Sequence, residues 1–293
     1  MPDKMIRPAT TTYLMIACFL LLSVLGCKKK SGKLNDPTQI IYLHHSTGRI
    51  IWEGEQNRLE KIIPAFGKPA VVKYLDDYNE NQGVNYRITP REFPAQSPYG
   101  WQNYPYDYYN IWVKHGNADY YMEEPTLKIL TEKYDVVVFK HCFPVSRMKR
   151  GTIPGNPDSR EKTLTNYQRQ YTLLKEKLRS YPGTKFLLWT GPALLKKHTN
   201  ESEASITKEF YDWVKNNWDT PEDNIFLWDF RELETEGELY LKSEYAFNPD
   251  NSHPSRAFGE RAARYFVQRL TDVIRNKGTG TDLTGQTTQY SNQ

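Results

Sequence analysis

Short apolar runs alternate with longer amphipathic stretches through the middle of the chain. Five runs rich in Val, Ile, Leu and Phe are predicted to be buried strands: residues 38–43, 70–74, 134–139, 184–189 and 224–228. Three stretches with apolar positions at helical spacing are predicted to be helices: residues 167–179, 205–216 and 256–274. This alternation is typical of an α/β fold with a central parallel sheet and helices on both faces.

Two further segments lack such patterns. Residues 76–124 are rich in Tyr, Asn, Pro and Gly, which favours an insertion or a set of active-site loops. Residues 276–293 carry few apolar side chains and are predicted to be a disordered tail. The chain has 293 residues, of which 38% are hydrophobic and 25% charged, enough for one sizeable core. We therefore expect one domain over residues 36–275.

The first 26 residues have the pattern of a secretory signal peptide. Lys4 and Arg7 precede an apolar stretch, residues 13–25, that is short for a membrane span. Residues 24–27, Val-Leu-Gly-Cys, resemble the bacterial lipobox, although Val24 stands where Leu is usual and Leu25 is bulky. The resemblance implies a lipid anchor on Cys27 and a lysine-rich flexible tether over residues 27–35. A cut elsewhere, or an uncleaved anchor helix, is the alternative.

The charge and the cysteine content bear on nucleic-acid binding and on disulfide formation. The net charge is +4, but six of the 39 Lys and Arg residues and one of the 35 acidic residues lie within the first 33 positions. The remaining chain is therefore close to neutral, which gives no support to nucleic-acid binding. Cys18 lies in the signal peptide and Cys27 at the lipid site, so Cys142 is alone in the domain and has no partner for an intramolecular disulfide.

Candidate chemistry begins where the first predicted strand ends, at the polar cluster of residues 44–48, His-His-Ser-Thr-Gly. Ligands bind at the carboxyl ends of strands in open α/β sheets. Ser46 stands where the next helix would start, so the first N–H groups of that helix can serve an oxyanion. Asp250 and His253 lie three residues apart just before the last predicted helix. A serine nucleophile needs a base and an orienting carboxylate, so Ser46, His253 and Asp250 are predicted to form a catalytic triad.

This order of residues resembles the SGNH (GDSL-like) hydrolases over residues 36–274. The resemblance implies a three-layer α/β/α sandwich of flavodoxin-like type with about five parallel strands, and a serine esterase activity. Asp250 and His253 match the terminal block of the family. In the first block only Ser46 matches, because His44 and His45 stand where the family has Gly-Asp.

The family resemblance also implies two further oxyanion donors beside Ser46, a glycine after the second strand and an asparagine after the third. The candidates for the glycine are Gly83 and Gly100. No asparagine follows the third predicted strand, and the candidates for its role are Lys140, His141, Cys142 and Ser146. The candidate substrate-binding residues are His45, Trp101 and Tyr104.

Each candidate also has a purely structural interpretation. Ser46 can cap the helix, and Asp250 can form an Asx turn. His45 can be a hydrogen-bonded structural residue. Neighbouring side chains in a strand point to opposite faces, so at most one of His44 and His45 should face the site. The histidines lack the close spacing of zinc motifs, and Cys142 directly follows His141, which is a poor arrangement for a thiol nucleophile. No metal or cofactor is therefore expected.

We expect an exported lipoprotein, held in the cell envelope through Cys27, that hydrolyses a carboxylic ester such as an acyl or acetyl group on a carbohydrate. Its expected partners are this substrate and the membrane. The alternative is a non-catalytic, glycan-binding surface lipoprotein on a degenerate SGNH scaffold. Aromatic residues make up 14% of the chain and would stack on sugars in that case.

Overall fold

The computed structural model describes residues 36–63, 67–100 and 102–287. The chain divides into residues 1–36 and a second unit, residues 37–293, and the fold below is that of the second unit. The predicted signal peptide, Cys27 and the tether up to residue 35 lie outside the described residues. Within the described ranges, no helix is both long and apolar enough to cross a bilayer.

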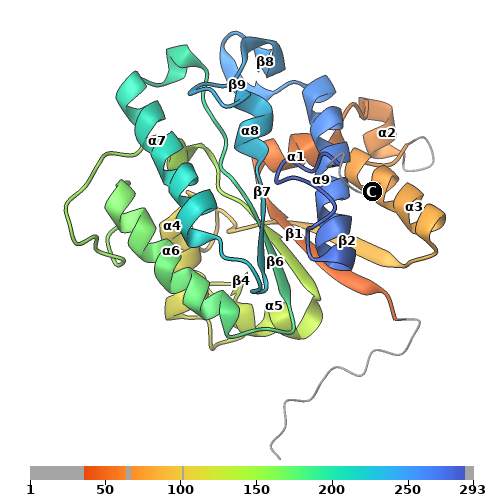
Figure 1. The fold of residues 1–293 in the computed structure, drawn as a ribbon. Helices are drawn as coiled ribbons and strands as arrows, with labels where there is room; N and C mark the ends of the chain where they lie inside the picture. The colour runs from red at the N-terminus through yellow and green to blue at the C-terminus, as the bar shows by residue number, and fades with distance from the viewer. Residues whose placement is uncertain (1–35, 64–66, 101, 288–293) are drawn as a thin grey trace, which may run out of the picture. The chain divides into compact units, whose positions relative to one another are not determined.

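A five-stranded parallel sheet forms the centre of the unit, with strand order β2-β1-β5-β6-β7 (Figure 1). The strands are β1 (Thr38–His44), β2 (Tyr86–Glu92), β5 (Val136–Phe139), β6 (Lys185–Trp189) and β7 (Ile225–Trp228). Counted within the sheet, the order is 2-1-3-4-5, which is the flavodoxin-like arrangement. The chain leaves β1 toward β2 on one side and later returns to β5 on the other. The carboxyl ends of β1 and β5 are therefore the switch point, where such sheets bind ligands.

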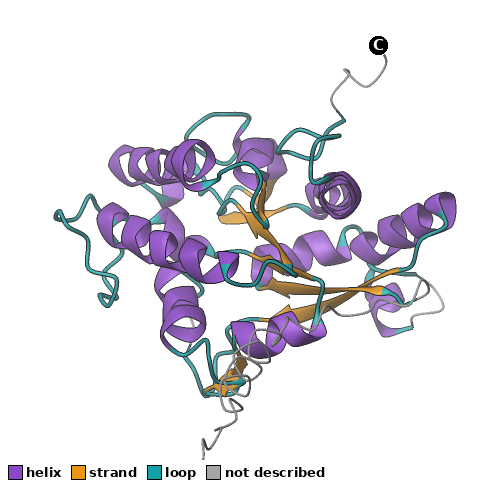
Figure 2. Ribbon diagram, turned by 60° about the horizontal axis from the view of Figure 1, so that its bottom comes forward, coloured by secondary structure: helices purple, strands orange, loops and turns teal. Residues whose placement is uncertain are grey.

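Helices cover both faces of this sheet, so the predicted three-layer α/β/α sandwich is confirmed (Figure 2). Ile40 and Tyr42 point to one face and Ile41 and Leu43 to the other, as the alternation of a strand requires. The first face is covered by α1 (Ser46–Glu53), α3 (Ala70–Gln82), α8 (Phe230–Thr235) and α9 (Arg256–Asn276). The second is covered by α4 (Pro105–Tyr108), η2 (Tyr109–Lys114), α5 (Leu127–Lys133), α6 (Leu164–Arg179), α7 (Glu201–Trp213) and η5 (Val214–Trp218).

Short elements fill the connections. Two small antiparallel hairpins pair β3 (Tyr120–Tyr121) with β4 (Glu124–Pro125), and β8 (Ala246–Asn248) with β9 (Asn251–Pro254). The remaining short helices are α2 (Arg58–Ile62), η3 (Phe143–Ser146), η4 (Lys196–His198) and η6 (Ser243–Tyr245). The β8–β9 hairpin contains Asp250 and His253 and leads into α9.

Four of the five predicted strands are confirmed, and the prediction for residues 70–74 is wrong. These residues open α3, whose buried side chains Ala70, Val71 and Leu75 follow helical spacing. The second strand of the sheet is β2, which lies within the segment predicted to be an insertion or loops, residues 76–124. Its sequence, YRITPRE, is largely exposed, because β2 is the outermost strand on its side. An edge strand does not need the apolar run by which buried strands are recognised.

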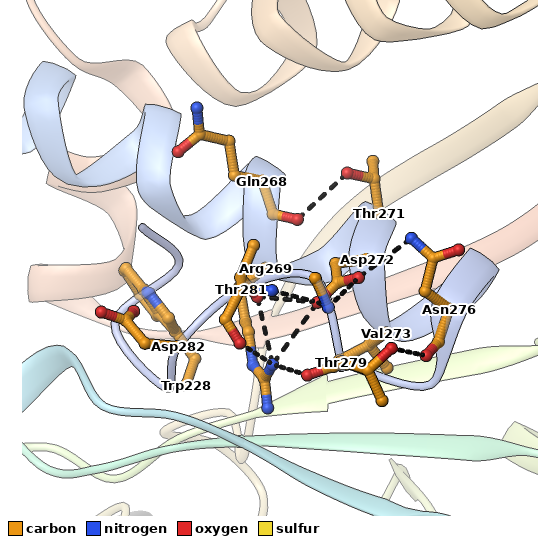
Figure 3. A network of polar contacts seen from close by, with 12 residues as sticks. Trp228, Gln268, Arg269, Thr271, Asp272, Val273, Asn276, Thr279, Thr281 and Asp282 are labelled. Atoms are coloured by element: carbon orange, nitrogen blue, oxygen red, sulfur yellow. Dashed lines mark hydrogen bonds and ion pairs between the residues drawn. The ribbon is translucent and has the colours of Figure 1, made fainter. Parts of the chain in front are cut away.

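Residues 277–287 are not the disordered tail that composition predicted. The Asp272 carboxylate of α9 accepts the backbone N–H groups of Gly280 and Thr281 at 3.0 and 2.9 Å, and the Thr281 hydroxyl at 2.8 Å (Figure 3). The buried Arg269 guanidinium donates to the Gly278 carbonyl at 2.8 Å and to the Leu227 carbonyl of β7 at 2.9 Å. Polar side chains thus hold this segment where apolar ones are scarce, which composition alone does not reveal.

Beyond Thr281 the segment continues along β7. The Leu283 carbonyl accepts the N–H of Asp229 at 2.7 Å, and the Thr284 carbonyl accepts the indole N–H of Trp228 at 2.8 Å. Residues 277–287 therefore belong to the folded domain, which extends past the boundary at residue 275 that the sequence predicted.

Candidate active site

The first part of the site is the junction between β1 and α1. His45 has an extended backbone and precedes the helix, and the first helical hydrogen bond runs from the N–H of Arg49 to its carbonyl at 2.9 Å. The N–H groups of Ser46, Thr47 and Gly48 come before that bond, so they have no acceptor within the helix. The half-buried Ser46 therefore stands among donors that are oriented toward the carboxyl edge of the sheet.

The two histidines of the motif are structural. The His44 ring stacks on Tyr42 with centroids 4.9 Å apart. The His45 Nε2 atom lies 2.7 Å from the Pro94 carbonyl, which can only accept, so Nε2 carries the proton. Burial lowers the pKa of His44 to about 3 and that of His45 to about 4, so both are neutral at pH 7. His45 is also almost completely buried, and the prediction that it contacts substrate is wrong.

Gly48 is required by the closeness of its neighbours. A Cβ atom at this position would lie 2.6 Å from the Cβ of His44 and 3.2 Å from the Cδ of Lys140. The Gly48 carbonyl accepts the Tyr42 hydroxyl at 3.0 Å, which holds the helix against the strand. The missing side chain is what lets the Lys140 stem lie along the first turn of α1.

Lys140 is a buried cation at the switch point. It follows β5 directly and is only 1% exposed. Its ammonium donates to the Cys142 sulfur at 3.3 Å, and its carbonyl accepts the Tyr108 hydroxyl at 2.7 Å. Lysines are rarely buried this far without a carboxylate partner. Among the described residues Lys140 has no such ion pair, and its charge helps to lower the pKa of His44, His45 and His253.

His253 is the group at the site best suited to proton transfer. Its Nδ1 atom lies 2.8 Å from the Oδ1 atom of Asn251, and the same oxygen accepts the His253 backbone N–H at 3.0 Å. Because an amide oxygen only accepts, Nδ1 carries the proton and Nε2 has the lone pair of a base. The pKa of the half-buried His253 is lowered, first by burial and then by the charge of Lys140, which keeps the ring neutral.

The predicted contact between Asp250 and His253 is not what the structure contains. The Asp250 side chain is 89% exposed and forms an ion pair with Lys197. Its backbone N–H donates to the Asn248 side chain at 2.8 Å, which places Asp250 in the turn of the β8–β9 hairpin. Asn251 and His253 lie two apart in β9, so their side chains share a face. Asn251 thus takes the orienting position that sequence spacing assigned to Asp250.

Ser46 and His253 are brought to the same region, because α1 and β9 are neighbours in the fold. Within the described part of the chain, neither side chain is hydrogen-bonded to the other. Catalytic hydrogen bonds are often long without substrate and shorten only in the complex. Their pairing therefore stays a prediction.

Several of the predicted oxyanion donors lie elsewhere or are already engaged. Gly83 ends α3 just before β2, at the opposite edge of the sheet from Ser46. His141 is fully buried, with its Nε2 atom 2.5 Å from the Tyr171 hydroxyl in the core. The Cys142 N–H donates to the Asn103 carbonyl at 2.9 Å, and the Ser146 hydroxyl donates to the Pro192 carbonyl. The His141 ring, the Cys142 N–H and the Ser146 hydroxyl are therefore engaged within the protein, and we do not assign them to a substrate.

The loop after β2 accounts for the other candidates. Gly100 follows β2, as the resemblance requires, and has open space around it. Trp101 lies outside the described residues. Tyr104 is only 2% exposed and packs in the core, so it does not contact substrate directly. Asn103, which sequence reasoning missed, is fully buried and donates to the Phe93 carbonyl at 2.6 Å, so it joins this loop to the end of β2.

A surface hollow of about 400 Å³ opens beside His253. Phe143 contributes an apolar wall, and its ring meets the His253 ring edge-on with centroids 4.9 Å apart. The hollow gives a substrate access to the base. Within the described ranges, no group of three or more His, Cys, Asp or Glu side chains could hold a metal ion.

No protein-family model matches the sequence, and no curated protein matches it either. The proposal below is therefore argued from the fold and the geometry of the site.

Proposed function

We propose that this protein is a serine esterase of the SGNH type that hydrolyses a carboxylic ester, such as an acyl or acetyl group on a carbohydrate. The observation that carries the proposal is the state of His253. Asn251 fixes its Nδ1 proton, so Nε2 is left as a base, next to a hollow and close to the helix start that bears Ser46.

In the proposed mechanism the Ser46 oxygen attacks the ester carbonyl while His253 Nε2 takes the hydroxyl proton. The proton then passes to the departing alcohol oxygen as the C–O bond breaks, which leaves an acyl-serine. Water, deprotonated by the same nitrogen, attacks the acyl-serine and releases the acid and the free serine. Asn251 orients the imidazole in the role of the triad carboxylate.

Two features support stabilisation of the oxyanion. The first-turn N–H groups of α1 have no acceptor within the helix and can donate to a negative oxygen. The buried charge of Lys140 lies along the same turn, where it favours the developing negative charge. The same charge favours the neutral, proton-accepting form of His253.

We extend the proposal to location. A lipid on Cys27, with residues 27–35 as tether, would hold the domain at the cell envelope, close to its glycan or ester substrate.

The glycan-binding alternative draws no support from the packing of the aromatic residues. Tyr104, Tyr108 and Trp112 lie in the core and are not free to stack on sugars, whereas Tyr120 and Phe247 are exposed. We propose the esterase because the state of His253 favours it, and the glycan-binding function stays the alternative.

The test compares Ser46→Ala with Ser205→Ala, a matched change at an exposed helical serine of α7. Ser46→Ala should abolish hydrolysis of short-chain aryl esters and of acetylated sugars, whereas Ser205→Ala should not. A fluorophosphonate should label the wild type at Ser46, as mapped by mass spectrometry. If the wild type hydrolyses no member of a broad ester panel and resists the probe, the proposal is wrong.

A further inference from the structure

The hollow beside His253 has a definite chemical character. Its lining includes the apolar residues Phe143, Pro144 and Leu194 and the cations Arg147 and Lys162. It therefore offers an apolar surface and cationic donors to one bound molecule.

The two cations of the hollow are not neutralised by neighbours. Among the described residues, neither Arg147 nor Lys162 has a carboxylate within ion-pair distance. The pKa of Lys162 is lowered by partial burial and by the charge of Arg147, which shows that the two cations act on one another. The charge of Asp107 acts on Lys162 more weakly. Like charges held together favour an anion that binds to both.

Among the described residues that line the hollow, Asp250 is the one with a carboxylate, and it is already paired. It forms an ion pair with Lys197, which lowers its pKa. The unpaired charge of the hollow is therefore positive.

Both cations are also held in place. One guanidinium nitrogen of Arg147 donates to the His198 carbonyl at 2.9 Å, and four further N–H donors of the group remain for a ligand. The Lys162 ammonium lies over the Tyr104 ring, 5.8 Å from its centroid. Such a cation–π contact positions a cation without cancelling its charge.

We propose that the hollow binds an anionic group, a carboxylate or a sulfate, on the sugar that bears the scissile ester. This inference rests on the proposed esterase function and names the substrate class as an acylated acidic glycan. Arg147 would take the anion through its planar fork and Lys162 as a point charge, while Phe143 and Leu194 contact the sugar ring.

The first experiment measures binding in the Ser46→Ala background, so that it does not depend on turnover. Methyl glucuronide, methyl glucoside 6-sulfate and methyl glucoside are titrated by calorimetry. Lys162→Met and Arg147→Gln should each weaken binding of the anionic ligands about tenfold, the usual scale for a hydrogen bond to a charged group. Lys149→Met, an exposed lysine in the same loop that does not line the hollow, is the matched control and should not weaken it.

The second experiment measures kcat/KM on acetylated methyl glucuronide and acetylated methyl glucoside. The wild type should prefer the anionic ester, and Lys162→Met should lower that preference about tenfold. Equal binding of charged and neutral ligands by the Ser46→Ala protein overturns the inference, even if the wild type is an esterase. Selective binding of the anions, lost in Lys162→Met, supports it even if no ester is hydrolysed, and in that case the esterase proposal fails. A preference for the glucuronide over the sulfate, or the reverse, identifies which anion the hollow takes.

Discussion

Gly48→Ala adds a methyl group at the most crowded point of the candidate site. The new carbon would lie 2.6 Å from the Cβ of His44, 2.9 Å from the Tyr42 hydroxyl and 3.2 Å from the Cδ of Lys140. Carbon atoms pack comfortably at about 3.5–4.0 Å, so the contact with His44 needs a displacement of about 1 Å. The His44 Cβ is fixed to the backbone of β1 and cannot rotate away, so the first turn of α1 has to move.

Two opposing effects set the size of the change. Overpacking of a close-packed site costs about 1–3 kcal/mol, whereas replacing a helical glycine by alanine gains at most about 1 kcal/mol. Because the 2.6 Å contact is with an atom fixed to the backbone of β1, the overpacking cost lies in the upper part of this range. The expected net destabilisation is therefore about 1–2 kcal/mol, which for a domain of this size lowers Tm by about 2–8 °C. If Ser46 moves with the helix, a displacement of about 1 Å at the nucleophile should also lower kcat by about 10²-fold.

The assay is urea unfolding followed by circular dichroism, with ester hydrolysis as a second readout. Gly183→Ala is the control, since a Cβ there meets nothing within 4 Å. It should leave stability unchanged or raise it by about 0.4–1 kcal/mol through the unfolded state. If Gly48→Ala is as stable as the wild type, the argument that close approach requires this glycine is refuted.

Three further predictions concern the base, the buried lysine and the anchor. Asn251→Ala should lower kcat by about 10²- to 10⁴-fold, because the imidazole loses its orienting acceptor, while Asp250→Ala, an exposed ion-pair partner, should change it less than about twofold; the reverse order in a steady-state assay would restore Asp250 to the triad. Lys140→Met should raise the pKa of His253, because it removes a positive neighbour, so the acid limb of the kcat/KM profile moves to higher pH. An NMR titration of the His253 ring that is unchanged in this variant would contradict the assignment. Cys27→Ser should move the protein out of the membrane fraction and abolish labelling by a radioactive fatty acid, and a wild type that takes up no label would exclude lipidation.

The strands that could be predicted from the sequence are those whose side chains are buried on both faces of the sheet. The strands β1, β5, β6 and β7 each contain an apolar run because both faces of the sheet are covered, and that signal can be read from the sequence alone. β2 was missed because an edge strand with Pro90 and several charges lacks an apolar run. The pair Val71 and Val72 favours a strand by composition, but packing against α9 decides for a helix.

Of the candidate site, the sequence predicted the positions of Ser46 and His253 but not their surroundings. Ser46 is the first residue of α1, and His253 lies in β9 just before α9. Their positions therefore depend on these elements rather than on the conformation of the loops. The partner of His253 depends on which residue of a tight hairpin turn points inward, and a shift of one position exchanges Asp250 for Asn251. The burial of Lys140 depends on contacts across the sheet that no local pattern records.

The segment after α9 and α9 itself cover part of the exposed edge of the sheet at β7. β7 is the outermost strand on its side of the sheet, and its unpaired backbone groups would otherwise be a template on which another chain could add a strand. The Leu227 carbonyl is occupied by the Arg269 guanidinium, and the Asp229 N–H, just past the strand, by the Leu283 carbonyl. At the other side, β2 discourages such pairing by different means, with Pro90 and the charges of Arg87 and Arg91. A chain that ended at Asn276 would keep the Arg269 contact with Leu227 but lose the Leu283 and Thr284 carbonyls that accept the Asp229 N–H and the Trp228 indole N–H. We expect the end of β7 to be more open to intermolecular strand pairing in such a chain.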